Sequence, residues 1–157
     1  MTDFTHLDKL GMVNMVNVTD KQTSTRTATA RAIVHLPFEV LQKFTGDDIQ
    51  TKKGAVFQIA IIAGIMAAKK TGDLIPLCHP LALDDCKIFI GLENNELIID
   101  CTTSITAKTG VEMEALTGVS VAALTVYDMC KALSHDIVIK EIKLLEKTGG
   151  KHDFKRE

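Results

Sequence analysis

The chain has 157 residues, of which 46% are hydrophobic and 24% charged, and its formal net charge is −2. These values are typical of one globular domain, 1–157, and the slightly acidic balance excludes a broad basic surface for nucleic acid. Aromatic residues make up only 4%, so stacking platforms for single-stranded nucleic acid are not expected either. We expect a cytoplasmic protein, because no signal-peptide pattern is present and the longest apolar run is too short for a membrane span.

Two strands and a short helical segment are expected in the first third of the chain. Alternating apolar residues predict a strand over 27–36, with the even-numbered side chains on one face. An earlier strand, 12–18, is expected to pair with it through a turn. After Pro37, a short helical segment is expected over 38–44.

Residues 54–70 predict a helix that is apolar nearly all round, so several of its sides must be covered. Ala60, Gly64 and Ala68 recur every four residues and form a stripe of small side chains, which lets another backbone approach. A second subunit is the partner expected for this stripe.

The second half of the chain predicts a hairpin, a long helix and a last strand. Residues 86–92 and 97–105 alternate in polarity around Asn94-Asn95, a hairpin turn signal. Residues 111–133 predict a helix, and 136–145 a strand whose pattern shifts at Lys140-Glu141, as at a β-bulge. The polar tail, 148–157, is expected to be mobile unless a ligand orders it.

The order of these elements predicts the fold class. From residue 27 onward, without the short helical segment, the order is strand, helix, strand, strand, helix, strand. This is the ferredoxin-like split βαβ pattern of the α+β class, an antiparallel sheet with both helices on one face. The strand at 12–18 is expected as an N-terminal addition to this unit.

Unusual polar residues lie at both ends of the long helix. Glu112 and Glu114 lie in its first turn, where acids also complement the helix dipole, while Asp128 and Lys131 near its end also fit a surface ion pair. At a boundary between water and apolar neighbours, the latter pair can accept and donate protons. Glu112 and Asp128 are 16 residues apart, about 24 Å along a helix. One reacting centre can use both only if two chains close a shared pocket about a symmetry axis.

A stiff loop, 73–80, follows the apolar helix and places Cys78 beside His79. Neighbours in an extended segment point to opposite sides, and no other cysteine or histidine cluster completes a ligand set, so no metal is expected. His79 fits a proton donor or an anion-binding group, and equally a structural histidine. Cys86 and Cys101 alternate with apolar strand residues and are interpreted as small core side chains.

Lysines lie beside glycines at three places: Lys52-Lys53-Gly54, Lys108-Thr109-Gly110 and 147–151. The first two precede expected helices, whose free N–H groups attract anions, and glycine lets the backbone approach a ligand closely. No Walker-type G-x-x-x-x-G-K-[ST] occurs, which excludes a nucleotide-hydrolysing P-loop. Together the three steps favour a polyphosphate ligand.

Motifs spread over nearly the whole chain fit one enzyme family. They are the loop Asp73-Leu-Ile-Pro-Leu-Cys-His-Pro80, the segment 108–124 and Tyr127-Asp-Met-Cys-Lys131, with Lys53-Gly54 and 147–151 in matching order. In this combination the chain resembles the cyclic pyranopterin monophosphate synthase family, which acts in molybdenum cofactor biosynthesis.

This resemblance implies a lyase acting on 3′,8-cyclo-7,8-dihydroguanosine 5′-triphosphate, a cyclised GTP derivative that a radical-SAM enzyme makes upstream. The products would be cyclic pyranopterin monophosphate and pyrophosphate. The resemblance also implies a homohexamer, a trimer of dimers, with active sites at the dimer interfaces. No cofactor and no nucleic-acid or membrane partner is expected.

The family's motifs carry over to nine residues. Asp128 is implied as the principal catalytic residue, with Lys131 and Lys53 as further catalytic candidates. The substrate-binding candidates are Leu77, Cys78, His79, Glu112, Met113 and Glu114. The alternative is a non-catalytic, ferredoxin-like regulatory module that binds a nucleotide in the same pocket.

Overall fold

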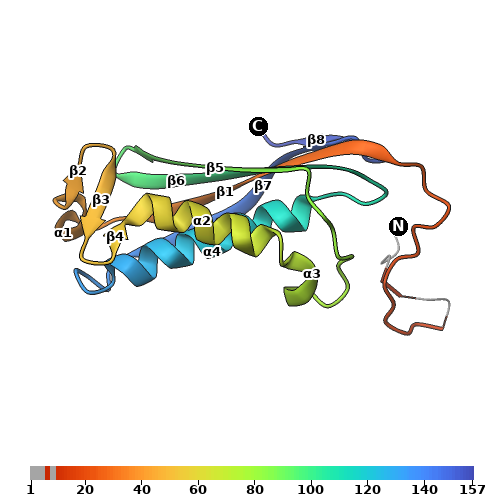
Figure 1. The fold of residues 1–157 in the computed structure, drawn as a ribbon, viewed down its shortest axis with the longest axis horizontal. Helices are drawn as coiled ribbons and strands as arrows, with labels where there is room; N and C mark the ends of the chain where they lie inside the picture. The colour runs from red at the N-terminus through yellow and green to blue at the C-terminus, as the bar shows by residue number, and fades with distance from the viewer. Residues whose placement is uncertain (1–5, 8–9) are drawn as a thin grey trace.

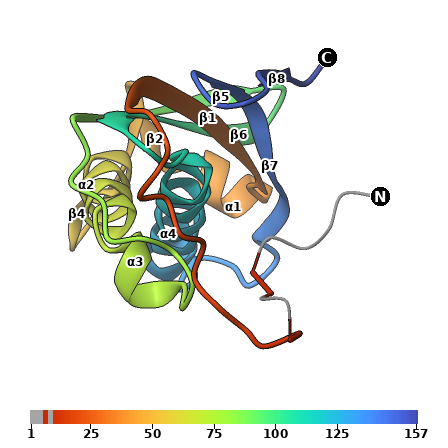
Figure 2. The same cartoon turned by 90° about the vertical axis from the view of Figure 1, so that its right-hand side faces the viewer.

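The computed structural model describes residues 6–7 and 10–157, and it shows a sheet with two long helices packed beneath it (Figure 1). Figure 2 looks along these helices, α2 and α4, and shows both on the same face of the sheet. In the described part of the chain, no helix is both long and apolar enough to cross a membrane. The elements are β1 (Ser24–His35), α1 (Phe38–Leu41), β2 (Phe44–Thr45), β3 (Asp48–Thr51), β4 (Gly54–Ala55), α2 (Val56–Ala68), α3 (Thr71–Leu74), β5 (Asp85–Glu93), β6 (Glu96–Ala107), α4 (Glu112–Cys130), β7 (Val138–Thr148) and β8 (Phe154–Lys155).

The larger sheet has the strand order β5-β6-β1-β7-β8, with antiparallel neighbours throughout. Counted along the chain without β8, its strands lie in the order second, third, first, fourth. Helix α2 connects the first strand to the second, and α4 connects the third to the fourth. This arrangement confirms the predicted ferredoxin-like α+β fold.

Strand β1 lies at the centre of the sheet, and its inward side chains form the middle of the core. Its inward side chains Ala28, Ala30, Ala32 and Val34 are each at most 1% exposed, which confirms the alternation predicted for 27–36. Because three of these residues are alanines, α4 can approach the sheet closely, and it packs against β1, β6 and β7.

Two local predictions in the sheet are confirmed. Asn94 and Asn95 have φ angles of 49° and 64°, the left-handed values that a tight type I′ hairpin requires. In the pairing of β7 with β1, the register passes from Glu141 to Ile139, so Lys140 is the extra residue of a β-bulge.

The stripe of small residues on α2 contacts α4 of the same chain. A Cβ on Gly64 would lie 2.8 Å from Gly118 O and 3.2 Å from Ala122 Cβ, so only glycine fits at this crossing. Ala60 and Ala68 are also buried. The expectation that a second subunit covers this stripe is therefore wrong, because α4 already covers it.

The strand expected at 12–18 is not formed. Within this segment only Val13 makes an isolated bridge, to Leu7, and the segment does not join the sheet. The physical reason lies in β1, whose two edges are already paired with β6 and β7. No backbone edge of β1 remains for a further strand.

Two shorter segments differ from or extend the expectations. The helical segment expected over 38–44 ends at Leu41, because Phe44–Thr45 pairs with β3 instead. In the tail, β8 pairs with β7 through Phe154 and Lys155. The mobility expected for 148–157 and the assignment of 1–157 to one domain stay predictions.

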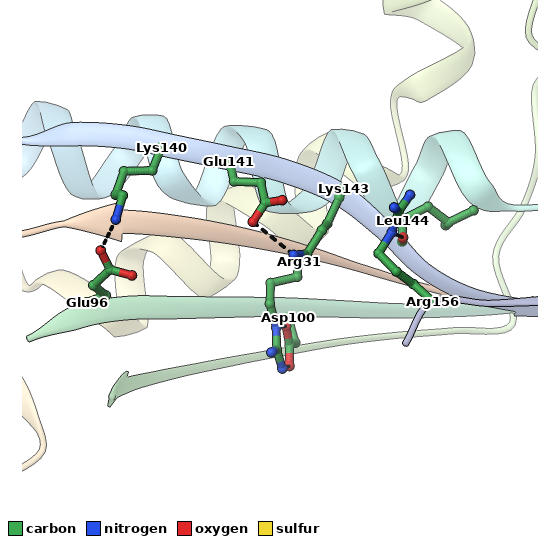
Figure 3. A network of polar contacts seen from close by, with 8 residues as sticks. All are labelled: Arg31, Glu96, Asp100, Lys140, Glu141, Lys143, Leu144 and Arg156. Atoms are coloured by element: carbon green, nitrogen blue, oxygen red, sulfur yellow. Dashed lines mark hydrogen bonds and ion pairs between the residues drawn. The ribbon is translucent and has the colours of Figure 1, made fainter. Parts of the chain in front are cut away.

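The outer face of the sheet carries ion pairs that follow the strand register (Figure 3). Arg31 lies opposite Asp100 and donates to both of its carboxylate oxygens, each at 2.7 Å. Further polar contacts on this face join Lys140 to Glu96, Lys143 to Glu141, and Arg156 Nε to Leu144 O. Ile33, Ile98 and Phe89 also lie on this face, so its polarity is mixed, while the main core lies on the helix side.

Candidate active site

The main candidate pocket opens at the start of α4 and has a volume of about 440 Å³. Five parts of the chain meet there. They are the N-terminal segment with His6 and 16–21, the start of β1 at 26–27, the loop 77–81, the turn 108–114, and the end of β7 with 147–151. Thr103 Oγ1 on β6 donates to Val111 O at 3.1 Å, which fixes the start of α4 against the sheet.

Positive charge dominates this pocket. The lysines and arginine among its described lining residues outnumber its two glutamates, Glu112 and Glu114. Within the described part of the chain, Lys147 is the one cation of this pocket that forms an ion pair, with its Nζ 2.8 Å from Glu112 Oε1. A pocket with such an excess suits an anion with several charges. The cationic residues are Lys21, Arg26, Lys108, Lys147 and Lys151.

Glu114 lies deeper than the other charged groups of the pocket, since it is only 3% exposed. Burial raises its pKa, and the nearby charge of Glu112 adds to this effect. The pKa of the Cys78 thiol is raised by burial and by Glu114, so Cys78 is no activated thiolate. Cys78 therefore suits a role in binding better than one as a nucleophile.

A second cluster lies at the opposite end of α4. Lys131 Nζ lies 2.6 Å from Asp128 Oδ1, and Lys53 Nζ lies 3.8 Å from Asp128 Oδ2. All three side chains are more than half exposed. The hydrogen bond from Lys131 lowers the pKa of Asp128, with further contributions from the charges of Lys131 and Lys53, and it raises the pKa of Lys131.

The turn between β3 and β4 places Lys53 in this second cluster. Thr51 Oγ1 donates to Gly54 O at 3.0 Å and accepts the Lys53 N–H at 3.1 Å, which closes the turn. Asp48 accepts the backbone N–H of Phe57, so the same short sheet also caps the start of α2.

The structure thus brings the nine predicted residues together as two groups. The start of α4 gathers the six substrate-binding candidates around one pocket, and the end of α4 gathers Lys53, Asp128 and Lys131. The 16 residues from Glu112 to Asp128 lie within α4, and they span about 24 Å. Within one chain, the two groups do not meet.

Comparison of the sequence with known proteins identifies a family. Residues 15–150 match the MoaC family. The chain belongs to the MoaC family. It is 51% identical over 151 residues to a protein of Xanthomonas campestris (strain 8004) named "Cyclic pyranopterin monophosphate synthase", covering 96% of this chain and 92% of that one. A protein of the same name from Xanthomonas axonopodis pv. citri is 49% identical with the same coverage.

A longer relative carries this MoaC sequence as one part. The chain is 52% identical over 155 residues to the "Molybdenum cofactor biosynthesis bifunctional protein" of Synechocystis. It spans 45% of that protein's length, and 96% of this chain is covered. The resemblance drawn from the motifs is confirmed at the level of the family.

Arg26 is a pocket residue of this MoaC chain that sequence reasoning missed. Its Nε donates to Ala107 O at 3.1 Å, and its side chain lines the pocket. Arg26 lies two residues before Ala28 on the same inward face of β1, just outside the buried core. A cation at an inward position of a strand is a signal that could have identified it.

Proposed function

We propose that the chain is a lyase of molybdenum cofactor biosynthesis, a cyclic pyranopterin monophosphate synthase. It converts 3′,8-cyclo-7,8-dihydroguanosine 5′-triphosphate into cyclic pyranopterin monophosphate and releases pyrophosphate. The observation that carries this proposal is membership of the MoaC family across residues 15–150. The charged pocket and the Asp128 cluster supply the chemistry that such a reaction needs.

The pocket at the start of α4 binds the substrate. Its lysines and Arg26 face a triphosphate that carries several negative charges, and they stabilise the pyrophosphate as it leaves. Leu77, Cys78, His79 and Met113 also line this pocket. Glu112, held by Lys147, keeps one cation fixed for the phosphates.

The cluster at the end of α4 moves protons. Asp128 stays ionised, because Lys131 and Lys53 hold its pKa below the ordinary range, while Lys131 stays protonated. The pair therefore offers one acceptor and one donor for the ring opening and the new ring closure. Lys53 provides a second cation beside the same carboxylate.

Two chains must combine these groups, and the surface of α4 supports a specific arrangement. Met113, Thr117, Val121, Leu124 and Asp128 follow a spacing of three or four residues, so they lie on one side of the helix. Leu124 is 57% exposed although it is apolar. A two-fold axis near Val121 sets the start of one α4 beside the end of the other, so the pair carries two complete sites.

The hexamer, a trimer of such dimers, is part of the proposal. On α2, Ile62 and Met66 are 58% and 50% exposed, which leaves a second apolar surface for contacts between dimers. We place the enzyme downstream of a radical-SAM enzyme, because a cyclised and reduced purine nucleotide has to be supplied to it. A stable complex with that enzyme is not required.

The direct test is incubation of the pure protein with the cyclised triphosphate. We expect release of one pyrophosphate for each pyranopterin formed. A coupled assay measures the pyrophosphate, and mass spectrometry measures the pyranopterin. Binding of the substrate without any product would overturn the proposal in favour of a regulatory nucleotide-binding module. Absence of both binding and product would overturn the pocket assignment as well.

A further inference from the structure

A pair of cysteines away from the candidate site lies at the contact between β5 and β6. Cys86 Sγ and Cys101 Sγ are 3.8 Å apart, close enough for a weak hydrogen bond between the two thiols. In the strand register Cys86 lies opposite Thr103, and Cys101 lies opposite Ile88, so the two cysteines are diagonal neighbours. Two paired strands, rather than flexible loops, hold these sulfurs together.

We propose that Cys86 and Cys101 are a redox modification site, at which hydrogen peroxide or a similar peroxide closes a reversible disulfide. The inference does not rest on the proposed function. It differs from the sequence interpretation, in which both cysteines are only small core residues.

The two sulfurs differ in access and in reactivity. Cys101 is fully buried, whereas Cys86 is only partly buried, so a peroxide reaches Cys86 first. The hydrogen bond with Cys101 lowers the pKa of Cys86, and the same bond together with burial raises the pKa of Cys101. Because the thiolate is the reactive form, Cys86 attacks and Cys101 resolves.

The chemical step balances with the peroxide alone. The Cys86 thiolate attacks one peroxide oxygen, the O–O bond breaks, and the departing hydroxide takes up the proton that Cys86 released, giving water and a sulfenic acid. The Cys101 sulfur then attacks the Cys86 sulfur, the S–O bond breaks, and the thiol proton leaves with the hydroxyl as a second water. The two thiols lose two electrons, and the peroxide gains them.

The position of β5 allows the small movement that the bond requires. To reach disulfide bonding distance from 3.8 Å, the sulfurs must approach each other by about 1.8 Å. Among the described residues, β5 is the outermost strand on its side of the sheet and pairs only with β6, so no second described strand resists this shift. β5 follows the pocket loop 77–81, and β6 leads into the pocket turn at 108. The bond therefore ties together two strands that connect to different parts of the pocket lining.

The test uses the full chain, hydrogen peroxide and alkylation. The reduced chain has four cysteines, so after denaturation it takes up four maleimide labels. After treatment with equimolar peroxide we expect a loss of two labels and a join between the tryptic peptides 71–87 and 88–108. Dithiothreitol should restore all four labels.

Variants assign the bond. Peptide 71–87 contains Cys78 as well as Cys86, so Cys78→Ala must keep the joined peptides, and Cys130→Ala, with the pair intact, is the matched control. Cys86→Ala and Cys101→Ala should each lose the join. The inference is overturned if wild type keeps four labels, or if the join persists in Cys86→Ala, a partly exposed position where truncation is tolerated better than at Cys101.

Discussion

Lys131 Nζ lies 2.6 Å from Asp128 Oδ1 at the end of α4, and this contact lowers the pKa of Asp128 and raises the pKa of Lys131. The pair is exposed, and Lys53 approaches it from the β3–β4 turn of the same chain. A carboxylate between two ammonium groups on an open surface contributes little to folding. The role proposed for this carboxylate is therefore on the substrate and not in the fold.

Asp128→Asn should therefore abolish catalysis without unfolding the protein. The amide keeps the shape but cannot accept a proton, so we expect kcat to fall by at least about 100-fold, the usual contribution of acid–base catalysis. Circular dichroism and Tm should match those of wild type. The control is Asp85→Asn, which breaks another exposed pair, Asp85 with Lys87 at 2.8 Å, outside both clusters. Normal turnover by Asp128→Asn would refute the acid–base assignment.

Lys151→Ala should weaken binding of the triphosphate end of the substrate. Lys151 lines the pocket at the start of α4, whereas Lys155, four residues on, lines a cavity on the other face of the sheet. Loss of one phosphate contact should weaken pyrophosphate binding by about tenfold, or about 1.4 kcal/mol. Isothermal titration with pyrophosphate measures this, with Lys155→Ala as the control. If both substitutions weakened pyrophosphate binding equally, the effect would come from the net charge of the tail and not from a direct contact of Lys151.

Gly149→Ala should displace the tail from the pocket. Gly149 has a φ of +79°, and a Cβ there would overlap Thr25 O, while Ser24 Oγ donates to Gly149 O at 2.7 Å. We expect a higher KM, because the segment carrying Lys151 must move. Gly46→Ala is the control, since Gly46 has a similar φ of +65° but open space around it. Gly46→Ala should lower the free energy of unfolding by about 1–2 kcal/mol, the cost of alanine in the left-handed region, and leave KM unchanged.

The sequence was sufficient for most of the fold, and the nine residues implied by the family resemblance fall into two spatial groups. The alternation of β1 and the asparagine turn are local signals, so they identified their elements without tertiary information. The strand expected at 12–18 failed because pairing depends on whether a neighbour's edge is free, which no local pattern reveals. The same limit applies to Gly64, whose partner helix could be recognised only after α4 was placed.

The pocket was only partly predictable. The lysine–glycine steps predicted anion binding at Lys108 and 147–151, which line the pocket, but their union with Arg26 depends on the antiparallel register of β1, β6 and β7. The burial of Glu114 also depends on packing, because the first turn of a helix can face water or the core. Its raised pKa is thus a property of the fold.

Glu114→Gln should stabilise the protein at neutral pH but not at low pH. Burial raises the pKa of Glu114 from an ordinary value of 4.5, so the folded state holds the proton more tightly than the unfolded state. Stability is therefore lost as the pH rises above about 4.5 and through the folded pKa. Glutamine has no proton to lose. In urea unfolding, the gain in free energy of unfolding over wild type should be larger at pH 7 than at pH 4. An equal gain at both values would contradict the buried, raised-pKa carboxyl.

Mixing two inactive variants tests whether the site is shared between chains. Glu112→Gln impairs the start of α4, and Asp128→Asn impairs its end, so each homo-oligomer has only defective sites. When the two are unfolded and refolded together, a shared site in a mixed dimer combines either both defects or neither. With random pairing, about a quarter of all sites should be intact, and activity should return to about a quarter of wild type.

The control for this mixing is each variant refolded alone, which should stay inactive. If each chain formed its own site from Asp128 and a distant Glu112, every site in the mixture would keep one defect, and activity would stay at the sum of the parts. We expect the shared site because α4 holds the two groups about 24 Å apart within one chain, a separation that no side-chain rotation removes. Val121→Asp supplies an independent check, since a charge at the proposed two-fold axis should reduce the dimer in light scattering and reduce activity to the same extent.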